Sequence, residues 1–341
     1  MSNQSRRRRF SLAAGLLTVS VLLAGCAEEV VPTFVPEAAP EYAPPAISED
    51  RAKVIFDEVE ELIAASDASG DIELMRPRVV SPAIDFRQSQ YALQAGTGGA
   101  EVPQSLWTDS EVFVITATDS WPRAVLAVSN PSSGSTLRFY LALTQDGPRD
   151  PYRLVAWSRL LPGVPTPSFA TAEIGSAPMT ADQSGLVQTP TDALVHLADV
   201  MTNAESQYAP EFADDPFRTF LAAELDGLKQ GAAEAGEASS ASTAGAPVFV
   251  IGTADGGALV MGTVDSTATL RKTIEGSKLT LSGSIAALGG PEDVEDTVKA
   301  TYKQMVTLYV PPAGAAAPQI QLLGAERVLA SVERVASEPA P

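Results

Sequence analysis

The chain has 341 residues, of which 45% are hydrophobic, and its 42 acidic residues outnumber its 23 basic ones to give a formal net charge of −19. Nucleic acids and anionic lipid surfaces are bound through clusters of basic side chains, so this composition argues against both as partners. A single cysteine cannot form an intrachain disulfide, and a single histidine leaves few ligands for a transition metal. We therefore expect neither a metal nor another cofactor.

The first 25 residues have the layout of an export signal. Arg6 to Arg9 precede an apolar run, Phe10 to Ala24, that is too short to span a bilayer. The run ends in Leu23-Ala24-Gly25-Cys26, which resembles the lipobox of bacterial lipoproteins. The resemblance implies cleavage between Gly25 and Cys26, attachment of a diacylglyceryl group to the Cys26 thiol, and anchoring on the extracytoplasmic face of the cell membrane. The general secretory and twin-arginine export routes both stay open.

Cleavage at this point would leave 19 basic and 42 acidic residues, a formal charge of −23. Residues 26–46 are predicted to form a tether between the lipidated cysteine and the folded part. Their composition favours extended polyproline II because prolines recur every few residues. These prolines are Pro32, Pro36, Pro40, Pro44 and Pro45.

Residues 47–161 are predicted to form a first α+β domain. A helix begins after Ser48, with acids in its first turn, and its apolar residues recur at helical spacing up to Ser69-Gly70. A second helix follows Ser81-Pro82. The sequence pattern then changes to one typical of β-strands. We expect an antiparallel meander of four strands at 112–115, 124–128, 137–143 and 152–161.

Residues 162–190 contain five prolines and are predicted to be a linker draped on the surface. Residues 191–335 then repeat the earlier pattern as a second α+β domain, followed by a tail at 336–341. Its helices begin at Thr191 and after Asp214-Asp215-Pro216. A mobile loop is predicted for the Ala, Gly and Ser-rich run 231–246. Strands are expected at 248–251, 258–264, 278–288, 298–310 and 320–332.

The two halves match each other in sequence. Val112–Ile115 recurs unchanged as Val248–Ile251, a shift of 136 residues that also aligns Asp119 with Asp255. Three matches in the same order predict a duplicated unit with a longer hairpin in the second copy. The other two align Ser81-Pro82 and Phe86 with Asp215-Pro216 and Phe220, and Leu154, Arg159 and Leu161 with Leu322, Arg327 and Leu329.

Two helices followed by an antiparallel meander bury themselves on one face of the sheet. A curved sheet wrapped on helices is the cone-shaped fold of nuclear transport factor 2 and its relatives, which this order of elements resembles. A cystatin-like sheet around one main helix is the alternative. The predicted fold class is therefore α+β, with two tandem domains that each pack helices on a curved antiparallel sheet.

Four further motifs are Trp121-Pro122-Arg123, Arg149-Asp150-Pro151-Tyr152, Leu160-Leu161-Pro162-Gly163 and Tyr309-Val310-Pro311-Pro312. In these stretches the chain resembles a group of uncharacterised actinobacterial lipoproteins that share a domain of unknown function. The resemblance covers nearly all of the mature chain and implies no known activity.

The sequence lacks the motifs of the common catalytic classes. His196 is the only base available to a Ser-His-Asp set, but it lies in an amphipathic helix, and the chain has no Gly-x-Ser-x-Gly elbow. A phosphate loop and a dinucleotide fingerprint are also missing. The densest acidic run, Glu292–Asp296, has no internal glycine and is interpreted as a solvated helix start instead of a calcium loop.

A carboxylate-based enzyme would need acids inside an apolar cone, where burial raises their pKa and allows proton exchange. Asp85, Asp119, Tyr140 and Asp255 are the candidates for such a site. Asp119 and Asp255 are also explained as turn residues whose side chains bond nearby backbone amides. No motif of such an enzyme can be matched residue by residue.

The tryptophans Trp107, Trp121 and Trp157 all lie in the first half. They mark either a ligand pocket or partner face, or simply core and edge packing. Trp121, Trp157, Asp119 and Asp255 are therefore the candidate ligand or partner residues.

Three functions fit these observations. The leading hypothesis is a membrane-anchored extracytoplasmic binding module that recruits an envelope protein or a small apolar ligand. A structural or assembly factor of the cell envelope is the first alternative, and a carboxylate-based envelope enzyme is the second.

Overall fold

A computed structural model of the chain describes residues 43–131, 136, 138–203 and 205–336. The predicted signal peptide, with Gly25 and Cys26, lies outside these residues, as do nearly all of the predicted tether and tail. In the described part, no helix combines the length and the apolar character needed to cross a membrane.

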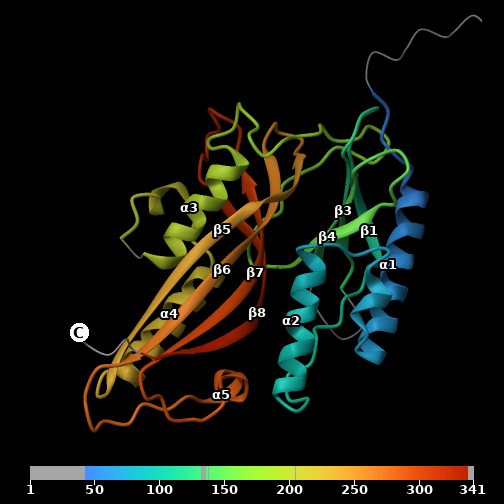
Figure 1. Cartoon of the computed structure of the whole chain (residues 1–341). Helices are drawn as coiled ribbons and strands as arrows, with labels where there is room; N and C mark the ends of the chain where they lie inside the picture. Colours follow the sequence, from blue (N-terminus) through green and yellow to red (C-terminus); the bar gives the residue numbers. More distant parts are fainter. Residues whose placement is uncertain (1–42, 132–135, 137, 204, 337–341) are drawn as a thin grey trace, which may run out of the picture. The chain divides into compact units, whose positions relative to one another are not determined.

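The first half contains two long helices and then four strands, as predicted (Figure 1). Helix α1 (Glu49–Ser69) begins after Ser48, whose hydroxyl accepts a hydrogen bond from the Arg51 amide. Gly70 ends the helix in a left-handed conformation, with φ of 71°. The other elements are η1 (Ile72–Met75), α2 (Ala83–Gly96), β1 (Ser110–Ile115), β2 (Arg123–Ser129), β3 (Phe139–Gln145) and β4 (Arg153–Leu160).

The second half repeats this order with longer strands and one added helix. Helices α3 (Pro190–Thr202) and α4 (Pro216–Ala232) each begin with a proline, directly after the capping side chain of Thr189 or Asp215. The remaining elements are η2 (Ala209–Glu211), β5 (Gly236–Gly252), β6 (Ala258–Lys272), α5 (Gly283–Gly289), β7 (Thr297–Val310) and β8 (Gln321–Val335).

All eight strands belong to one antiparallel sheet, in the order β1-β2-β3-β4-β8-β7-β6-β5. The sheet is curled into a half-barrel. Each half of the chain contributes one meander, and the meanders join where β4 pairs with β8. The prediction of two tandem domains, NTF2-like or cystatin-like, is therefore wrong. A repeat in the sequence indicates two copies of a unit, but it does not show that the last strand of each copy satisfies the free edge of the other.

The matching segments Val112–Ile115 and Val248–Ile251 lie in the two outermost strands, β1 and β5. Arg159 and Arg327 lie in the two central strands, β4 and β8. The order of strands from each edge inward is thus the same in both meanders, with equivalent strands on opposite sides of the junction.

The junction between β4 and β8 is short. Arg159 pairs with Ala325, and Leu160 pairs with Gly324. Just beyond these pairs, the Leu161 amide donates to the Leu323 carbonyl over 2.9 Å. Three consecutive positions therefore connect the two meanders by backbone.

Gly324 allows these strands to approach closely. A Cβ atom at this position would lie 2.5 Å from the hydroxyl oxygen of Ser158 and 2.8 Å from the carbonyl oxygen of Arg159. The Ser158 hydroxyl instead forms a buried 2.6 Å hydrogen bond with the hydroxyl of Thr307, the residue that faces Gly324 on β7. The missing side chain of Gly324 thus makes room for a polar contact between β4 and β7.

The predicted linker does not simply lie on the surface, because residues Ser176–Pro178 bridge the two outer edges of the sheet. The Ser176 amide donates to the Ile115 carbonyl at the end of β1, over 2.8 Å. On the other side, the Gly252 amide at the end of β5 donates to the Ala177 carbonyl over 3.0 Å. This segment therefore covers one end of both free edges, where unpaired backbone groups would otherwise remain.

The second meander is buried on both faces, because successive side chains of a strand point to opposite sides. On β6, Leu259 and Met261 belong to the main core, which also contains the buried faces of α1 and α2. Ala258 and Val260 belong to a separate core beneath α3. Both meanders thus share one hydrophobic core, which is a further reason why they do not behave as separate domains.

Three local predictions in the second half are wrong. Glu292–Asp296 does not start a helix, since it is an irregular segment before β7 in which Asp293 forms an isolated bridge with Thr280. Most of the run 231–246 is not a loop but the first part of β5, in which half-buried and exposed residues alternate. Its small side chains suit an edge strand that packs against α3, where the Ser242 amide donates to the Thr202 hydroxyl over 2.7 Å. Residues 278–288 are not a strand, because their C-terminal part forms α5 and Leu279 and Leu281 enter a small third core.

Replacing Gly324 with alanine is expected to destabilise the fold by about 1–3 kcal/mol, because the added methyl group overpacks the junction. Gly227→Ala is the matched control, since nothing lies within 4 Å of a Cβ there and the residue is inside α4. Its expected effect is a gain of about 0.5–1 kcal/mol from helix propensity. Urea unfolding of both variants measures the difference, and equal stabilities would contradict the importance assigned to the junction.

Candidate functional site

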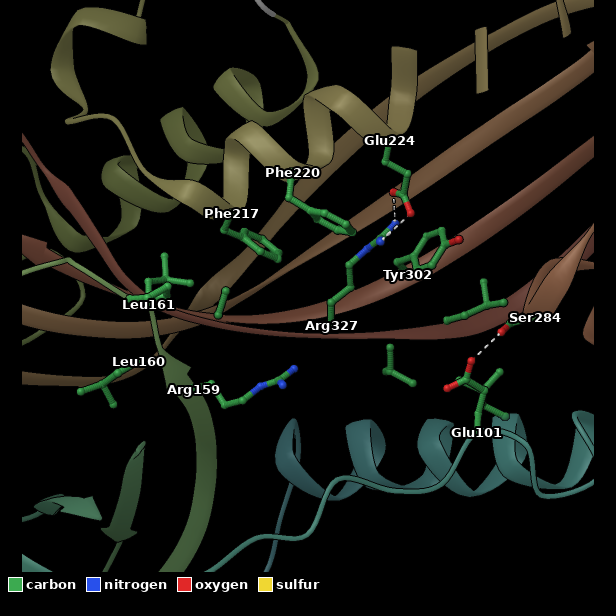
Figure 2. Close-up of a pocket in the computed structure, with 15 residues that line it drawn as sticks. Glu101, Arg159, Leu160, Leu161, Phe217, Phe220, Glu224, Ser284, Tyr302 and Arg327 are labelled. Carbon is green, nitrogen blue, oxygen red and sulfur yellow. Dashed lines mark hydrogen bonds and ion pairs between the residues drawn. The ribbon is translucent and has the colours of Figure 1, made fainter. Parts of the chain in front are cut away.

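A groove with a volume of about 540 Å³ lies beside the junction of the two meanders, between α2 and α4 (Figure 2). Its size falls in the range of about 300–1,000 Å³ that is typical of small-molecule sites. Aromatic and aliphatic side chains make up most of its wall, with two arginines and two glutamates among them. The lining residues are Leu93, Glu101, Arg159, Leu160, Leu161, Pro162, Phe217, Phe220, Glu224, Ser284, Tyr302, Ala325, Arg327, Val328 and Leu329.

The helix that covers the groove, α4, is loosely packed. Of its 17 residues only Ala232 is fully buried. Phe220 points toward the groove in Figure 2 and remains 53% exposed. A second hollow of about 200 Å³ lies along α4, where Leu221 and Leu225 line it together with polar residues of the helix and residues of α3 and the sheet. The apolar face of α4 therefore has unfilled space beneath it on the side of the sheet.

Arg327 lines both of these spaces, together with Glu224 and Tyr302. Its Nη1 and Nη2 atoms donate to the two carboxylate oxygens of Glu224 on α4, over 3.0 and 2.8 Å. The guanidinium carbon lies 3.5 Å from the ring centre of Tyr302 on β7 and 6.0 Å from that of Phe220. Burial raises the pKa of Tyr302, so its hydroxyl stays neutral. The ion pair and the stacked ring connect α4 to the sheet.

Arg159 forms the second ion pair of the groove. Its Nε and Nη2 atoms donate to the two oxygens of Glu326, over 2.8 and 2.9 Å. The Glu326 side chain is only 2% exposed, whereas that of Arg159 is 37% exposed. Burial raises the pKa of Glu326, while the nearby charges of Arg159 and Arg87 act in the opposite direction. The carboxylate thus lies behind the arginine, and Figure 2 shows the guanidinium directed into the groove.

The inserted segment between β6 and β7 contributes one side of the groove. Ser284, in α5, donates a 3.1 Å hydrogen bond to Glu101, which follows α2. Leu288 of α5 packs so closely on Gly96 that a Cβ there would lie 2.3 Å from its Cδ2 atom. The described part of the first meander has no helix that corresponds to α5, so this side of the groove comes from the second copy alone.

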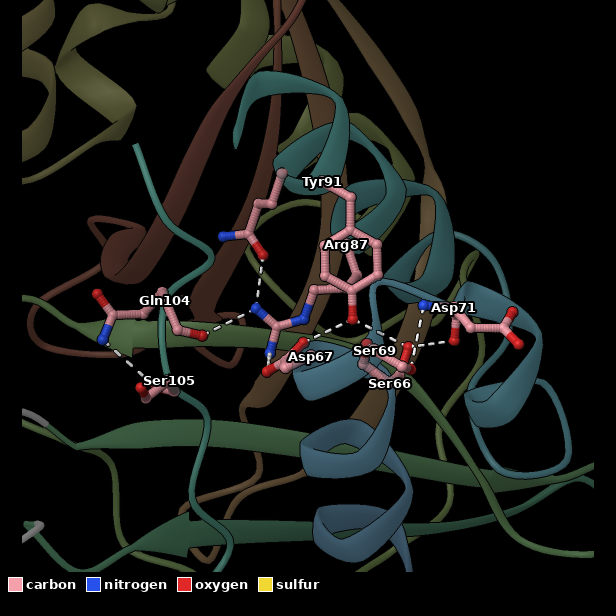
Figure 3. A network of polar contacts seen from close by, with 9 residues as sticks. Ser66, Asp67, Ser69, Asp71, Arg87, Tyr91, Gln104 and Ser105 are labelled. Atoms are coloured by element: carbon pink, nitrogen blue, oxygen red, sulfur yellow. Dashed lines mark hydrogen bonds and ion pairs between the residues drawn. The ribbon is translucent and has the colours of Figure 1, made fainter. Parts of the chain in front are cut away.

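A buried arginine supports α2 from behind the groove (Figure 3). The Arg87 side chain is 1% exposed and lies 5.6 Å from the ring centre of Trp157. Its Nη1 atom donates to the side-chain oxygen of Gln90 and to the carbonyl of Gln104, each over 2.8 Å. Asp67 of α1 lies 3.3 Å from its Nη2 atom. Burial lowers the pKa of Arg87, and the neighbouring charges counteract this shift.

The two candidate tryptophans have different environments. Trp157 is 2% exposed and packs edge-on against Phe86, with ring centres 5.6 Å apart, so it belongs to the core. Trp121 is 37% exposed, and the guanidinium of Arg123 lies 4.4 Å from its ring centre. It lines a separate groove of about 510 Å³ with Met179, Phe249 and other residues.

The two aligned aspartates also differ. Asp255 is a turn residue as predicted, since its Oδ1 atom accepts hydrogen bonds from the Gly257 amide and the Thr253 hydroxyl, over 3.2 and 2.6 Å. Its Oδ2 atom accepts a 2.5 Å hydrogen bond from the hydroxyl of Tyr309. Asp119 is exposed and makes no side-chain hydrogen bond with a described residue. The structure does not bring either of them to the groove beside Arg159.

The remaining catalytic candidates lie apart from one another. His196 forms a 2.7 Å contact with Glu211 and stacks on Tyr208, with ring centres 3.7 Å apart. Tyr140 is fully buried, and burial raises its pKa. Asp85 accepts a 2.6 Å hydrogen bond from Ser81 at the start of α2. Within the described ranges, no group of three or more His, Cys, Asp or Glu residues is arranged to hold a metal ion.

The charged residues of the groove were missed as site residues. Arg159 and Arg327 did appear in the sequence repeat as aligned positions, which was the one available signal. Their partners, Glu326 and Glu224, were not marked by any signal in the sequence. Neither acid is at ion-pair spacing in the sequence from its arginine, since 167 and 103 positions separate the partners.

Comparison with known families assigns the chain to a family. A family model described as a domain of unknown function (DUF8094) matches residues 43–333. The chain belongs to this family. The expected membership of an uncharacterised family is thereby confirmed at that level. No curated protein and no solved structure matches the chain significantly.

The Asp255 turn gives a testable pH effect. Burial raises the pKa of Asp255, but the hydrogen bonds from Thr253, Tyr309 and Gly257 outweigh it and hold this pKa below its usual value. The stabilisation is therefore present above the usual carboxyl pKa and is lost as the pH falls through the lower folded value. Tyr309→Phe is expected to raise the pKa of Asp255 in an NMR titration, with Tyr302→Phe as the control that leaves it unchanged. An unchanged value in Tyr309→Phe would contradict this assignment.

Proposed function

We propose that the chain is a lipid-anchored binding protein of the extracytoplasmic face of the cell membrane, and that the groove between α2 and α4 is its binding site. The anchor is inferred from Leu23-Ala24-Gly25-Cys26 and the apolar run before it. The ligand is a small molecule with a substantial apolar part. The proposal concerns molecular binding, and no reaction is attributed to the chain.

The observation that carries this proposal is the unfilled apolar space beneath α4. An amphipathic helix normally gains stability by burying its apolar face, at about 25 cal/mol per Å² of area removed from water. Phe217 and Leu221 of α4 are only half-buried, and Phe220 is exposed. A ligand with an apolar body would complete this burial in the groove.

The charges of the groove support binding more than proton transfer. Glu224 uses both carboxylate oxygens on Arg327, and Glu326 uses both on Arg159. A general acid or base needs a carboxylate that can exchange a proton with its substrate. The paired carboxylates therefore favour a binding role over the carboxylate-based enzyme.

The groove around Trp121 favours a second role, contact with an envelope protein. Trp121 is the exposed aromatic residue there, and the Ala46 amide, at the end of the predicted tether, donates to the Thr116 carbonyl over 2.8 Å. Thr116 lines the same groove. The chain thus enters the fold beside this surface, and a partner could contact both.

Binding in the groove between α2 and α4 is tested with N-phenyl-1-naphthylamine, a neutral apolar probe whose fluorescence rises on burial. Residues 27–341 are expected to bind it, and Phe220→Asp to weaken binding about tenfold, because a charge replaces apolar contact area. Val195→Asp is the matched control, since Val195 is 51% exposed on α3 and lies outside the groove. Equal binding by both variants would place the probe elsewhere.

The anchor is tested in cells by fractionation of the full chain. Cys26→Ser is expected to move the protein from the membrane fraction to the soluble fraction, because stable anchoring requires the acyl chains. Thr33→Ser, a conservative change in the predicted tether, should leave the protein with the membrane. Retention of Cys26→Ser in a carbonate-washed membrane fraction would argue against lipidation.

A further inference from the structure

We infer that the groove between α2 and α4 takes a single-chain amphiphile with an anionic head, and that Arg159 contacts this head while the apolar wall holds the chain. This inference rests on the proposed function and specifies its ligand. It is drawn from the two ion pairs in the groove. They differ in how many accessible N–H donors the arginine keeps for a ligand.

Arg159 keeps one guanidinium nitrogen free to donate to a ligand. Glu326 occupies its Nε and Nη2 atoms, and Nη1 has no hydrogen-bond partner among the described residues. Because Glu326 is buried and Arg159 is partly exposed, the positive end of this ion pair is directed to the groove. A guanidinium nitrogen in this position is a strong donor to a carboxylate or phosphate oxygen.

The donors of Arg327 are less accessible. Its Nη1 and Nη2 atoms each donate to Glu224, its Nε atom is buried without a hydrogen-bond partner among the described residues, and Tyr302 covers the face of the guanidinium. It therefore provides a rigid wall of the groove. A ligand is oriented by Arg159, whose 37% exposed side chain is more accessible than the 15% exposed side chain of Arg327.

The acids on the inner wall of the groove are not available to bind a cationic ligand. Both oxygens of Glu224 and both oxygens of Glu326 are used by the arginines. Glu101 is exposed, and its Oε1 atom accepts the hydrogen bond from Ser284. At the Arg159–Glu326 pair, the unused capacity is therefore that of a donor, which favours an anion at this end of the groove.

The apolar wall explains why the ligand is an amphiphile instead of a free anion. One partly hydrated guanidinium nitrogen, already next to a carboxylate, does not by itself hold an ion that is well solvated in water. Burial of an acyl chain adds about 0.8 kcal/mol per CH₂ group. Leu160 and Leu161 continue directly from Arg159, and Phe217 and Phe220 face them across the groove in Figure 2, so charge and apolar surface are adjacent.

The test measures displacement of N-phenyl-1-naphthylamine from residues 27–341 near neutral pH. Dodecanoate and its neutral methyl ester share the same chain. We expect dodecanoate to displace the probe at an about tenfold lower concentration than the ester, because it alone offers Arg159 an anionic acceptor. Excess inorganic phosphate is expected to leave the probe bound.

The informative variant removes both members of the ion pair, since Arg159 alone cannot be lost without leaving Glu326 buried and unpaired. In Arg159→Met/Glu326→Gln, dodecanoate and the ester are expected to become equally effective while the probe still binds. Arg123→Met, which removes one positive charge beside Trp121, is the control that retains the preference. Circular dichroism verifies that both variants are folded.

Each other result overturns a defined part of the inference. Equal displacement by dodecanoate and the ester in the unmodified chain rejects the anionic head but leaves the binding site. Absence of probe binding rejects the proposed function itself. Flotation of residues 27–341 with vesicles of phosphatidylglycerol and phosphatidylcholine, without displacement of the probe by dodecanoate, identifies a bilayer surface as the occupant, and it rejects a single-chain ligand.

Discussion

The pairing of β4 with β8 is the constraint on which the rest of this fold depends. Each meander could have ended in a free edge. Instead the last strand of one pairs with the last strand of the other, so the two meanders form one sheet. Only a few backbone contacts make this connection, and Gly324 is needed for it because a side chain there would collide with Ser158. The shared core of α1, α2 and both meanders then follows from the position of the junction.

The same junction explains where the charged groups of the groove lie. Arg159 and Arg327 are equivalent by repeat, yet they meet different partners because the strands that carry them are neighbours in the sheet. Arg159 bonds across the junction to Glu326 of the other copy, whereas Arg327 bonds to Glu224 of α4. The same position of the repeat therefore has two roles. Arg159 connects the two copies, and Arg327 holds α4 on the sheet.

Local features were predictable from the sequence, because capping residues and periodicity act over a few positions. The helix 49–69 and the second helix of each half are examples. The pairing of β4 with β8 was not predictable, because no local sequence pattern indicates which strand edges will meet. The run 231–246 was assigned to a loop from its composition, although its small residues suit an edge strand beneath a helix. Trp157 and Asp255 became structural residues once their neighbours were known.

The departure from symmetry between the copies is what leaves space beneath α4. The second copy has longer strands and the insertion with α5, so α4 lies over a wider surface than it can fill. A perfectly repeated unit would have packed its second helix as tightly as α2, in which six residues are buried. Space beneath α4 costs apolar burial that the fold alone does not recover. A site that an amphiphile completes is the arrangement in which this cost is offset, and it places the ligand between the helix and the junction.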